Sequence, residues 1–260
     1  MSKQSTLIYE LKGLKMSYND HVALNVGRLQ FHRGTIYGII GSIGSGKSTL
    51  LNVMAGLEKE SEGSIMYDMK SFDRNWLGKV KPRAEIKLFN STNTNKNKKV
   101  SSVLKERIPN KNLSTYFKNE SLNLILEKSI SDLSLAESSY LNMILAINCD
   151  PRVLLIDDYA IHFDKSMEID FRKKLLRMNK DLGTTILLSA PHDQLLKSIA
   201  SVLIYLDNGH ISKIRSNSSK SKMIKPKRDN ETRIKSKKKY KSSYSKQRSD
   251  RWMNKYANFT

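Results

Sequence analysis

A short glycine-rich stretch carries the residue types that bind phosphate. It reads Gly41-Ser42-Ile43-Gly44-Ser45-Gly46-Lys47-Ser48-Thr49 and fits the pattern of a glycine, any four residues, then Gly-Lys-Ser/Thr. Glycines let backbone amides approach an anion, and the lysine ammonium reaches the outer phosphates of a nucleoside triphosphate. The hydroxyl of Ser48 is the Mg²⁺ ligand of this pattern. The alternative is a glycine-rich turn that happens to contain a lysine.

The residues on both sides of this stretch favour the phosphate site. The apolar run from Thr35 to Ile40 predicts a buried strand, and the segment from Leu50 to Gly56 has helical spacing and ends on glycine. A helix that starts near Lys47 directs unpaired backbone amides and the positive end of its dipole toward the loop. Strand, loop and helix together predict a triphosphate-binding site.

Polar residues follow two more apolar segments. Asp157 and Asp158 come directly after Val153–Ile156, and His192 comes shortly after the segment from Thr184 to Ser189. Because ligands bind at the carboxyl ends of parallel strands, we expect these residues beside the phosphate loop. Carboxylates at such a position can hold Mg²⁺ or act on water.

The remaining segments predict an α/β protein with a mainly parallel sheet. Antiparallel strands are expected before the phosphate loop and one more after it, and the Asp207-Asn208-Gly209 turn predicts a hairpin. Helical patterns cover residues 100–145 and 167–179. The strands are expected at residues 6–11, 14–18, 21–31, 62–67, 202–206 and 210–214, and the apolar residues from Ile86 to Phe89 precede a polar, loop-like stretch at 91–99.

Length and composition exclude some classes of protein. The 260 residues allow one or two domains, and no run of eighteen apolar residues predicts a membrane span. The polar N-terminus does not resemble a secretory signal. The only cysteine, Cys149, excludes an internal disulfide and fits a reducing compartment, and we interpret it as a small packing residue.

The positive charge is concentrated at the C-terminal end. The formal net charge is +21, and residues 213–260 hold 17 Lys/Arg against 3 Asp/Glu, which contributes +14 of it. With almost no apolar residues, residues 215–251 are expected to be disordered in isolation. Such a tail fits an anionic membrane surface or RNA, or only solvent. Trp252, Tyr256 and Phe259 could form one face of a short terminal helix.

With these motifs in this order, residues 5–214 resemble the ATPase subunit of an ABC transporter. Tyr18 lies 23 residues before Gly41, and Ser134 lies 23 residues before Asp157, as in that family. The resemblance implies a P-loop NTPase core with a mainly parallel sheet, an N-terminal antiparallel β subdomain and a helical subdomain at about 85–145. It implies an ATP-binding domain over residues 1–214, followed by the basic tail at 215–260.

The resemblance also implies the cofactors, ATP and Mg²⁺, and a role for each residue. Tyr18 stacks on adenine, the phosphate loop with Lys47 holds the phosphates, and Asp157 holds Mg²⁺ together with Ser48. Asp158 polarises the attacking water, and His192 contacts the γ-phosphate. An exposed tyrosine and a surface histidine are the simpler alternatives for Tyr18 and His192.

Three positions depart from the family pattern. Asp158 stands where the family has glutamate, so the carboxylate is one methylene shorter and hydrolysis is expected to be slow. Asn90 aligns with the loop glutamine. The signature, Leu-Ser-Gly-Gly-Gln, aligns with Leu133–Glu137, in which Ser134 could still face a partner's γ-phosphate. Ser134 and Glu137 also fit an ordinary capped helix.

We therefore predict an ATP-hydrolysing subunit that pairs on ATP, as a homodimer or with another ABC ATPase, and powers a separate membrane permease. It would be cytoplasmic, at the inner face of the membrane. Two alternatives remain at this point. One is a nucleotide-gated RNA- or ribosome-binding protein, suggested by the tail. The other is a weakly hydrolytic regulatory subunit of a heterodimer, suggested by the three departures.

Overall fold

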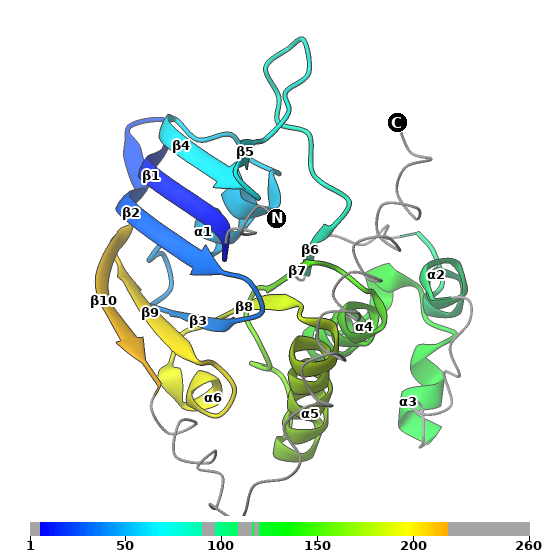
Figure 1. Cartoon of the computed structure of the whole chain (residues 1–260). Helices are drawn as coiled ribbons and strands as arrows, with labels where there is room; N and C mark the ends of the chain where they lie inside the picture. Colours follow the sequence, from blue (N-terminus) through cyan, green and yellow to red (C-terminus); the bar gives the residue numbers. More distant parts are fainter. Residues whose placement is uncertain (1–5, 90–96, 109–115, 117–119, 218–260) are drawn as a thin grey trace, which may run out of the picture. The chain divides into compact units, whose positions relative to one another are not determined.

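The computed structural model describes residues 6–89, 97–108, 116 and 120–217 (Figure 1). The strands of this part form two separate sheets. No helix in these residues is long and apolar enough to cross a bilayer. Asn90 and the expected terminal helix lie outside the described residues.

The first sheet has four strands and contains the antiparallel β subdomain predicted from the sequence. Its strand order is β2-β1-β4-β5, and every pair is antiparallel. Asn19 takes a left-handed conformation, with φ 51°, in the tight turn between β1 and β2. The strands are β1 (Leu7–Tyr18), β2 (His21–His32), β4 (Glu62–Tyr67) and β5 (Lys70–Ser71).

The second sheet has six strands in the order β10-β9-β3-β8-β7-β6. Strands β9, β3, β8, β7 and β6 run parallel to one another, and β10 pairs with β9 in an antiparallel hairpin. This confirms the predicted mainly parallel sheet. Arg215 and Ser216 still pair in β10, so the strand continues into the segment expected to be tail. The strands are β3 (Ile36–Ile40), β6 (Ile86–Phe89), β7 (Val153–Ile156), β8 (Thr185–Ala190), β9 (Val202–Asp207) and β10 (His210–Ser216).

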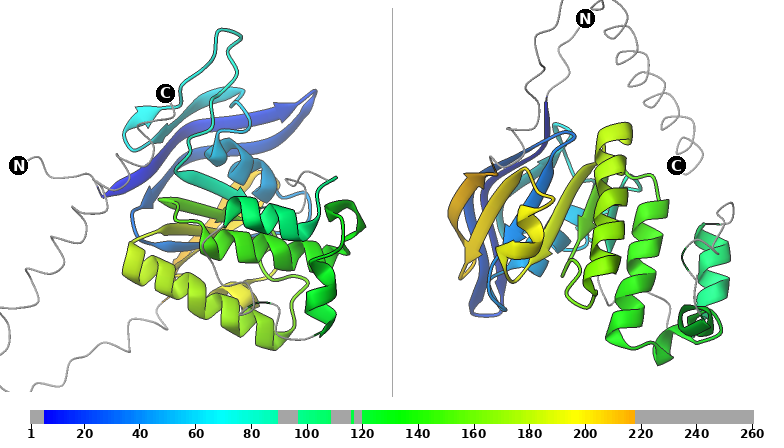
Figure 2. Two further views of the ribbon diagram at one scale, coloured as in Figure 1. Left: turned by 90° about the vertical axis from the view of Figure 1, so that its right-hand side faces the viewer. Right: turned by 90° about the horizontal axis from the view of Figure 1, so that it is seen from below.

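Helices cover both faces of the six-stranded sheet. Helix α1 packs between the two sheets, because its Leu50, Leu51 and Met54 share one core with strands of both. Helices α4 and α5 pack on the opposite face, in a second core (Figure 2). The helices are α1 (Lys47–Ala55), α2 (Val100–Arg107), α3 (Glu120–Ile125), a 3₁₀ turn η2 (Ile130–Asp132), α4 (Leu135–Asn148), α5 (Lys165–Leu182) and α6 (Asp193–Lys197).

The alternation of side chains along β8 shows why this sheet is apolar on both sides. Ile186, Leu188 and Ala190 face the helices α4 and α5, whereas Leu187 faces α1. All six residues of β8 are buried. A strand covered on both faces needs continuous apolar character, so any polar residue in it requires a local partner.

Candidate active site

The phosphate loop connects β3 to α1, as the sequence predicts. Gly44 and Gly46 both have positive φ, 80° and 98°. A Cβ on Gly46 would lie 2.5 Å from the carbonyl oxygen of Ala23, and one on Gly41 would lie 2.3 Å from that of Leu206. Positions 41 and 46 therefore accept only glycine without a shift of the backbone, because the loop packs directly against the carbonyl groups of Leu206 and Ala23.

The loop offers donors to an anion. The Lys47 ammonium bends back over it and donates to the carbonyl oxygens of Gly41 and Ser42, each at 2.8 Å. Helix α1 has no acidic residue in its first turn and no side chain capping its N-terminus. The buried Ser45 hydroxyl has no hydrogen-bond partner among the described residues. The unpaired Ser45 hydroxyl, the uncapped helix N-terminus and the ammonium above the loop fit the phosphates of a nucleotide.

The strand register brings the predicted residues to one edge of the sheet. Ile40 at the end of β3 pairs with Ala190 in β8, and Leu188 pairs with Ile156 at the end of β7. Gly41, Asp157 and His192 therefore follow three adjacent strands. Ile156 also pairs with Phe89, the last residue of β6. Asn90 follows Phe89 in the sequence but lies outside the described residues.

A buried serine that the sequence analysis did not single out bonds to the carboxylate of Asp157 and to the backbone of Asp158. The Ser189 hydroxyl donates to the Asp157 carboxylate and accepts a bond of 2.9 Å from the backbone N–H of Asp158. Asp158 has φ 54°, in the left-handed region. The available signal was a polar residue inside the otherwise apolar segment from Thr185 to Ala190.

The electrostatics of Asp158 connect it to the phosphate loop. Although much of the residue is exposed, burial raises the pKa of its carboxyl, and the charge of Asp157 raises it further. The positive charges of Lys47 and His162 act in the opposite direction. Interactions of this kind weaken with distance, so Asp158 lies close enough to Lys47 for its pKa to respond to the lysine's charge.

Tyr18 lies at the end of β1, beside the start of α1. It is 44% exposed, and its hydroxyl donates to Glu58. Partial burial and the Glu58 carboxylate raise the pKa of Tyr18 to about 12, and a hydrogen bond with the Thr49 side chain opposes them. Glu58 also accepts a bond of 2.8 Å from Asn52 in α1. The exposed ring is thus fixed next to the phosphate loop, where a base could stack on it.

His192 and Ser134 occupy different positions in the fold. His192 is exposed, lies two residues after the end of β8 and is the N-cap residue of the short helix α6. Ser134 caps α4, and its hydroxyl accepts from the Glu137 N–H while the Glu137 carboxylate accepts from the Ser134 N–H. A bond to Lys128, and then these contacts with Ser134, lower the pKa of Glu137. An ionised carboxylate therefore occupies the N-terminus of α4.

This capping box leads to a stability prediction. Ser134→Ala is expected to lower the free energy of unfolding by about 1 kcal/mol, because the first turn of α4 loses a bonded N–H. Urea unfolding monitored by circular dichroism measures this change. Ser138→Ala removes the same hydroxyl from inside the helix and should have almost no effect; equal losses for both variants would contradict the capping role.

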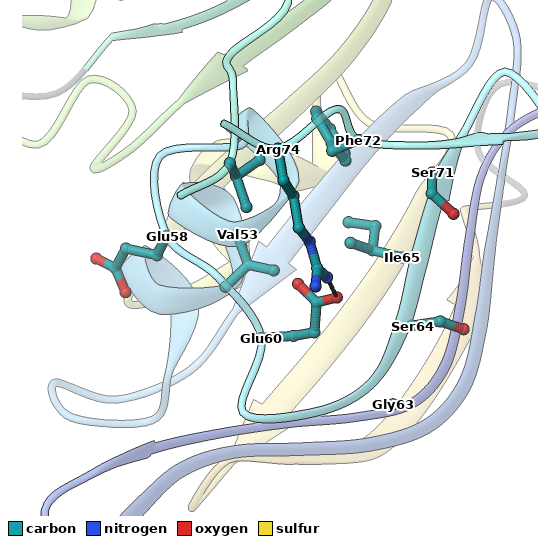
Figure 3. Close-up of a pocket in the computed structure, with 10 residues that line it drawn as sticks. Val53, Glu58, Glu60, Gly63, Ser64, Ile65, Ser71, Phe72 and Arg74 are labelled. Carbon is teal, nitrogen blue, oxygen red and sulfur yellow. Dashed lines mark hydrogen bonds and ion pairs between the residues drawn. The ribbon is translucent and has the colours of Figure 1, made fainter. Parts of the chain in front are cut away.

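A small pocket lies between the C-terminal half of α1 and the strands β4 and β5. It encloses about 150 Å³ and contains the Glu60–Arg74 ion pair, 2.6 Å long (Figure 3). This volume is below the 300 Å³ or more of typical ligand pockets. We therefore assign no nucleotide to it. No group of three or more His, Cys, Asp or Glu that could bind a metal was found in the described part of the chain.

The fold and the site define a P-loop nucleotide-binding domain. The family model for the ABC transporter matches residues 24–160, which is more than half of the chain. The chain therefore belongs to the ABC transporter family. This confirms the resemblance inferred from the motifs.

Curated relatives support the same assignment. The methionine import ATP-binding protein MetN of Legionella pneumophila (strain Lens) is 30% identical over 214 residues, which cover 78% of this chain and 62% of the relative. MetN of Brucella abortus (strain 2308) is 29% identical over 221 residues, covering 80% and 59%. The chain thus spans about three fifths of the length of these relatives.

Solved structures share the fold. CbiO1 from Clostridium perfringens, part of the ABC transporter complex cbiONQ, matches with a TM-score of 0.64 and 22% identity, over 84% of this chain and 92% of that one. The dimeric bacterial ABC transporter cassette MJ0796 matches with a TM-score of 0.67 and 20% identity, over 81% and 99%.

Proposed function

We propose that this chain is an ATP-binding and ATP-hydrolysing subunit that pairs on ATP and drives a separate membrane permease. The observation that carries the proposal is the shared sheet edge, where the phosphate loop with Lys47 follows β3 and the carboxylates of Asp157 and Asp158 follow β7, with only β8 between the two strands. The family supports the same activity, and the relatives named for methionine import favour import as the direction.

In the proposed site, each residue has one task. The Tyr18 ring stacks on adenine, and Lys47 with the amides of α1 holds the β- and γ-phosphates. Ser48 and Asp157 would hold Mg²⁺, which neutralises the charge on the transferring phosphoryl group. Asp158 orients the attacking water and receives its proton, and His192 contacts the γ-phosphate. Asn90, Gly41, Ser42, Gly44, Ser45, Gly46 and Thr49 complete the proposed binding residues.

Hydrolysis is expected to be slow. An aspartate at position 158 reaches one methylene less far than the glutamate of the family, and water positioning is sensitive to about 1 Å. The water oxygen bonds to the γ-phosphorus, the bond to the β-phosphate oxygen breaks, and ADP and inorganic phosphate leave.

The proposed assembly is head to tail, with Ser134 of one subunit facing the nucleotide of the other. The cassette MJ0796, which shares the fold, is dimeric, and this favours pairing of the chain. The chain would then lie at the inner face of the membrane, bound to the permease. We prefer this to RNA binding, because the relatives are named for methionine import.

Light scattering of the full-length chain after size-exclusion chromatography tests the assembly. With Asp158→Asn, which slows turnover, ATP and Mg²⁺ should convert monomer to dimer, and ADP should not. If the chain stays monomeric alone, the same experiment with a detergent extract of the native membrane should yield a complex with a second ATPase subunit and a permease. Recovery of ribosomal components, or of no ATP-dependent complex, would overturn the proposal.

A further inference from the structure

Ser189 is the one serine in β8, and it lies among apolar neighbours. The residue is 0% exposed, like Leu187 and Leu188 before it and Ala190 after it. It shares a face of the strand with Leu187, which packs on the α1 side of the sheet. A buried hydroxyl in such surroundings is unfavourable unless its bonds are made.

Ser189 contacts three successive residues after β7. Its hydroxyl donates to the Oδ1 atom of Asp157 and accepts from the Asp158 N–H at 2.9 Å, and its carbonyl oxygen accepts from the Tyr159 N–H at 2.8 Å. A serine hydroxyl has one hydrogen and two lone pairs, so both side-chain bonds form together. The Asp157 carboxylate only accepts hydrogen bonds, so the serine hydrogen points to it and a serine lone pair receives the Asp158 N–H.

These bonds restrict the orientation of the Asp157 carboxylate and the backbone conformation of Asp158. One lone pair of Asp157 Oδ1 is occupied, which restricts the rotation of the carboxylate. The bond to the Asp158 N–H holds that residue at φ 54°, a conformation that few residues other than glycine adopt. The chain therefore takes a left-handed conformation directly after Asp157.

We propose that Ser189 is a positioning residue that orients the Asp157 carboxylate toward Mg²⁺. This inference rests on the proposed function, because it concerns the same Mg-ATP site. Partners that hydrogen-bond a metal-binding carboxylate orient it, and their loss typically weakens metal affinity 10- to 100-fold. The hydroxyl acts on Asp157 and does not itself touch the nucleotide.

Metal dependence of nucleotide binding in the full-length chain tests this role. A fluorescent ATP analogue is titrated in EDTA and then at increasing Mg²⁺, and Mn²⁺ binding is followed by electron paramagnetic resonance. Ser189→Ala should bind the analogue in EDTA within about twofold of the wild type. The Mg²⁺ needed for half-maximal enhancement should rise about 10-fold or more, with an equal loss of Mn²⁺ affinity.

Thr185→Ala is the matched control. Thr185 is buried on the same face of β8, at the far end, and its hydroxyl accepts from the Gly34 N–H at 3.0 Å. This variant loses a buried hydroxyl and should lose stability, but its metal dependence should equal that of the wild type. A merely structural role for Ser189 would make the two variants alike.

Equal Mg²⁺ and Mn²⁺ affinities in Ser189→Ala and Thr185→Ala would overturn the inference. If Ser189→Ala does not fold, Ser189→Cys replaces the hydroxyl by a thiol of similar size that is a weaker hydrogen-bond donor. An unshifted Mg²⁺ requirement in Ser189→Cys would also overturn the inference. Failure of the wild type to bind the analogue, with no difference from Lys47→Ala, would overturn the proposed function and this inference with it. Normal wild-type binding with an unshifted serine variant overturns this inference alone.

Discussion

Lys47→Ala is expected to reduce ATP affinity by roughly 10- to 150-fold, the equivalent of about 1.5–3 kcal/mol for a lost hydrogen bond to a charged group. The ammonium is buried over the phosphate loop, bonded to two carbonyl oxygens. On nucleotide binding it would exchange these neutral acceptors for phosphate oxygens, which are charged and therefore stronger. ATPase activity should fall with the affinity.

Equilibrium titration with a fluorescent ATP analogue measures the loss. Lys59→Ala is the matched control, because Lys59 is an exposed lysine just beyond α1. It should leave the affinity unchanged. Wild-type affinity in Lys47→Ala would mean that the nucleotide does not occupy the glycine loop.

Asp158→Asn is expected to lower ATP hydrolysis by roughly 10²- to 10⁴-fold while ATP still binds, because general-base catalysis contributes about this much. The amide cannot accept the proton of the attacking water. Asparagine also tolerates positive φ, so the turn after β7 should keep its shape. Single-turnover hydrolysis and analogue binding, measured on the same preparation, separate the two effects. Loss of binding equal to the loss of turnover would contradict a catalytic role.

The same variant should change the pH dependence of stability. Burial, and then Asp157, raise the pKa of Asp158 in the folded chain. A folded state with a raised pKa holds the proton more tightly than the unfolded chain. The stability from this site is therefore complete below the unfolded pKa and is lost as pH rises through the folded pKa.

Asn cannot lose a proton, so Asp158→Asn should gain stability relative to the wild type as pH rises from the unfolded aspartate pKa, about 3.9, through the higher folded pKa. Thermal unfolding of both proteins without nucleotide, across this range, tests the sign. A difference in melting temperature that is constant or shrinks as pH rises would show that the folded state does not raise this pKa.

Local sequence signals predicted much of this fold. The continuous apolar run Val153–Ile156 gave a buried parallel strand, and the turn at Asn208 and Gly209 gave the β9–β10 hairpin with positive φ at both residues. The glycine loop was recognised with its flanking strand and helix. These features depend on residues adjacent in the chain, so the periodicity of the sequence is sufficient to predict them.

Contacts across the sheet were decided only by the tertiary structure. The order β3-β8-β7 places Ser189 beside Asp157, 32 residues away in sequence, and no periodicity encodes which strands become neighbours. The sequence alone left Ser134 open between a phosphate ligand and a helix cap; in this structure its hydroxyl accepts from the Glu137 N–H. The sequence by itself determined the family, the phosphate loop and the strand-end carboxylates. The folded chain decided how those carboxylates are held, because a buried hydroxyl must bond to whatever polar group packing brings within reach.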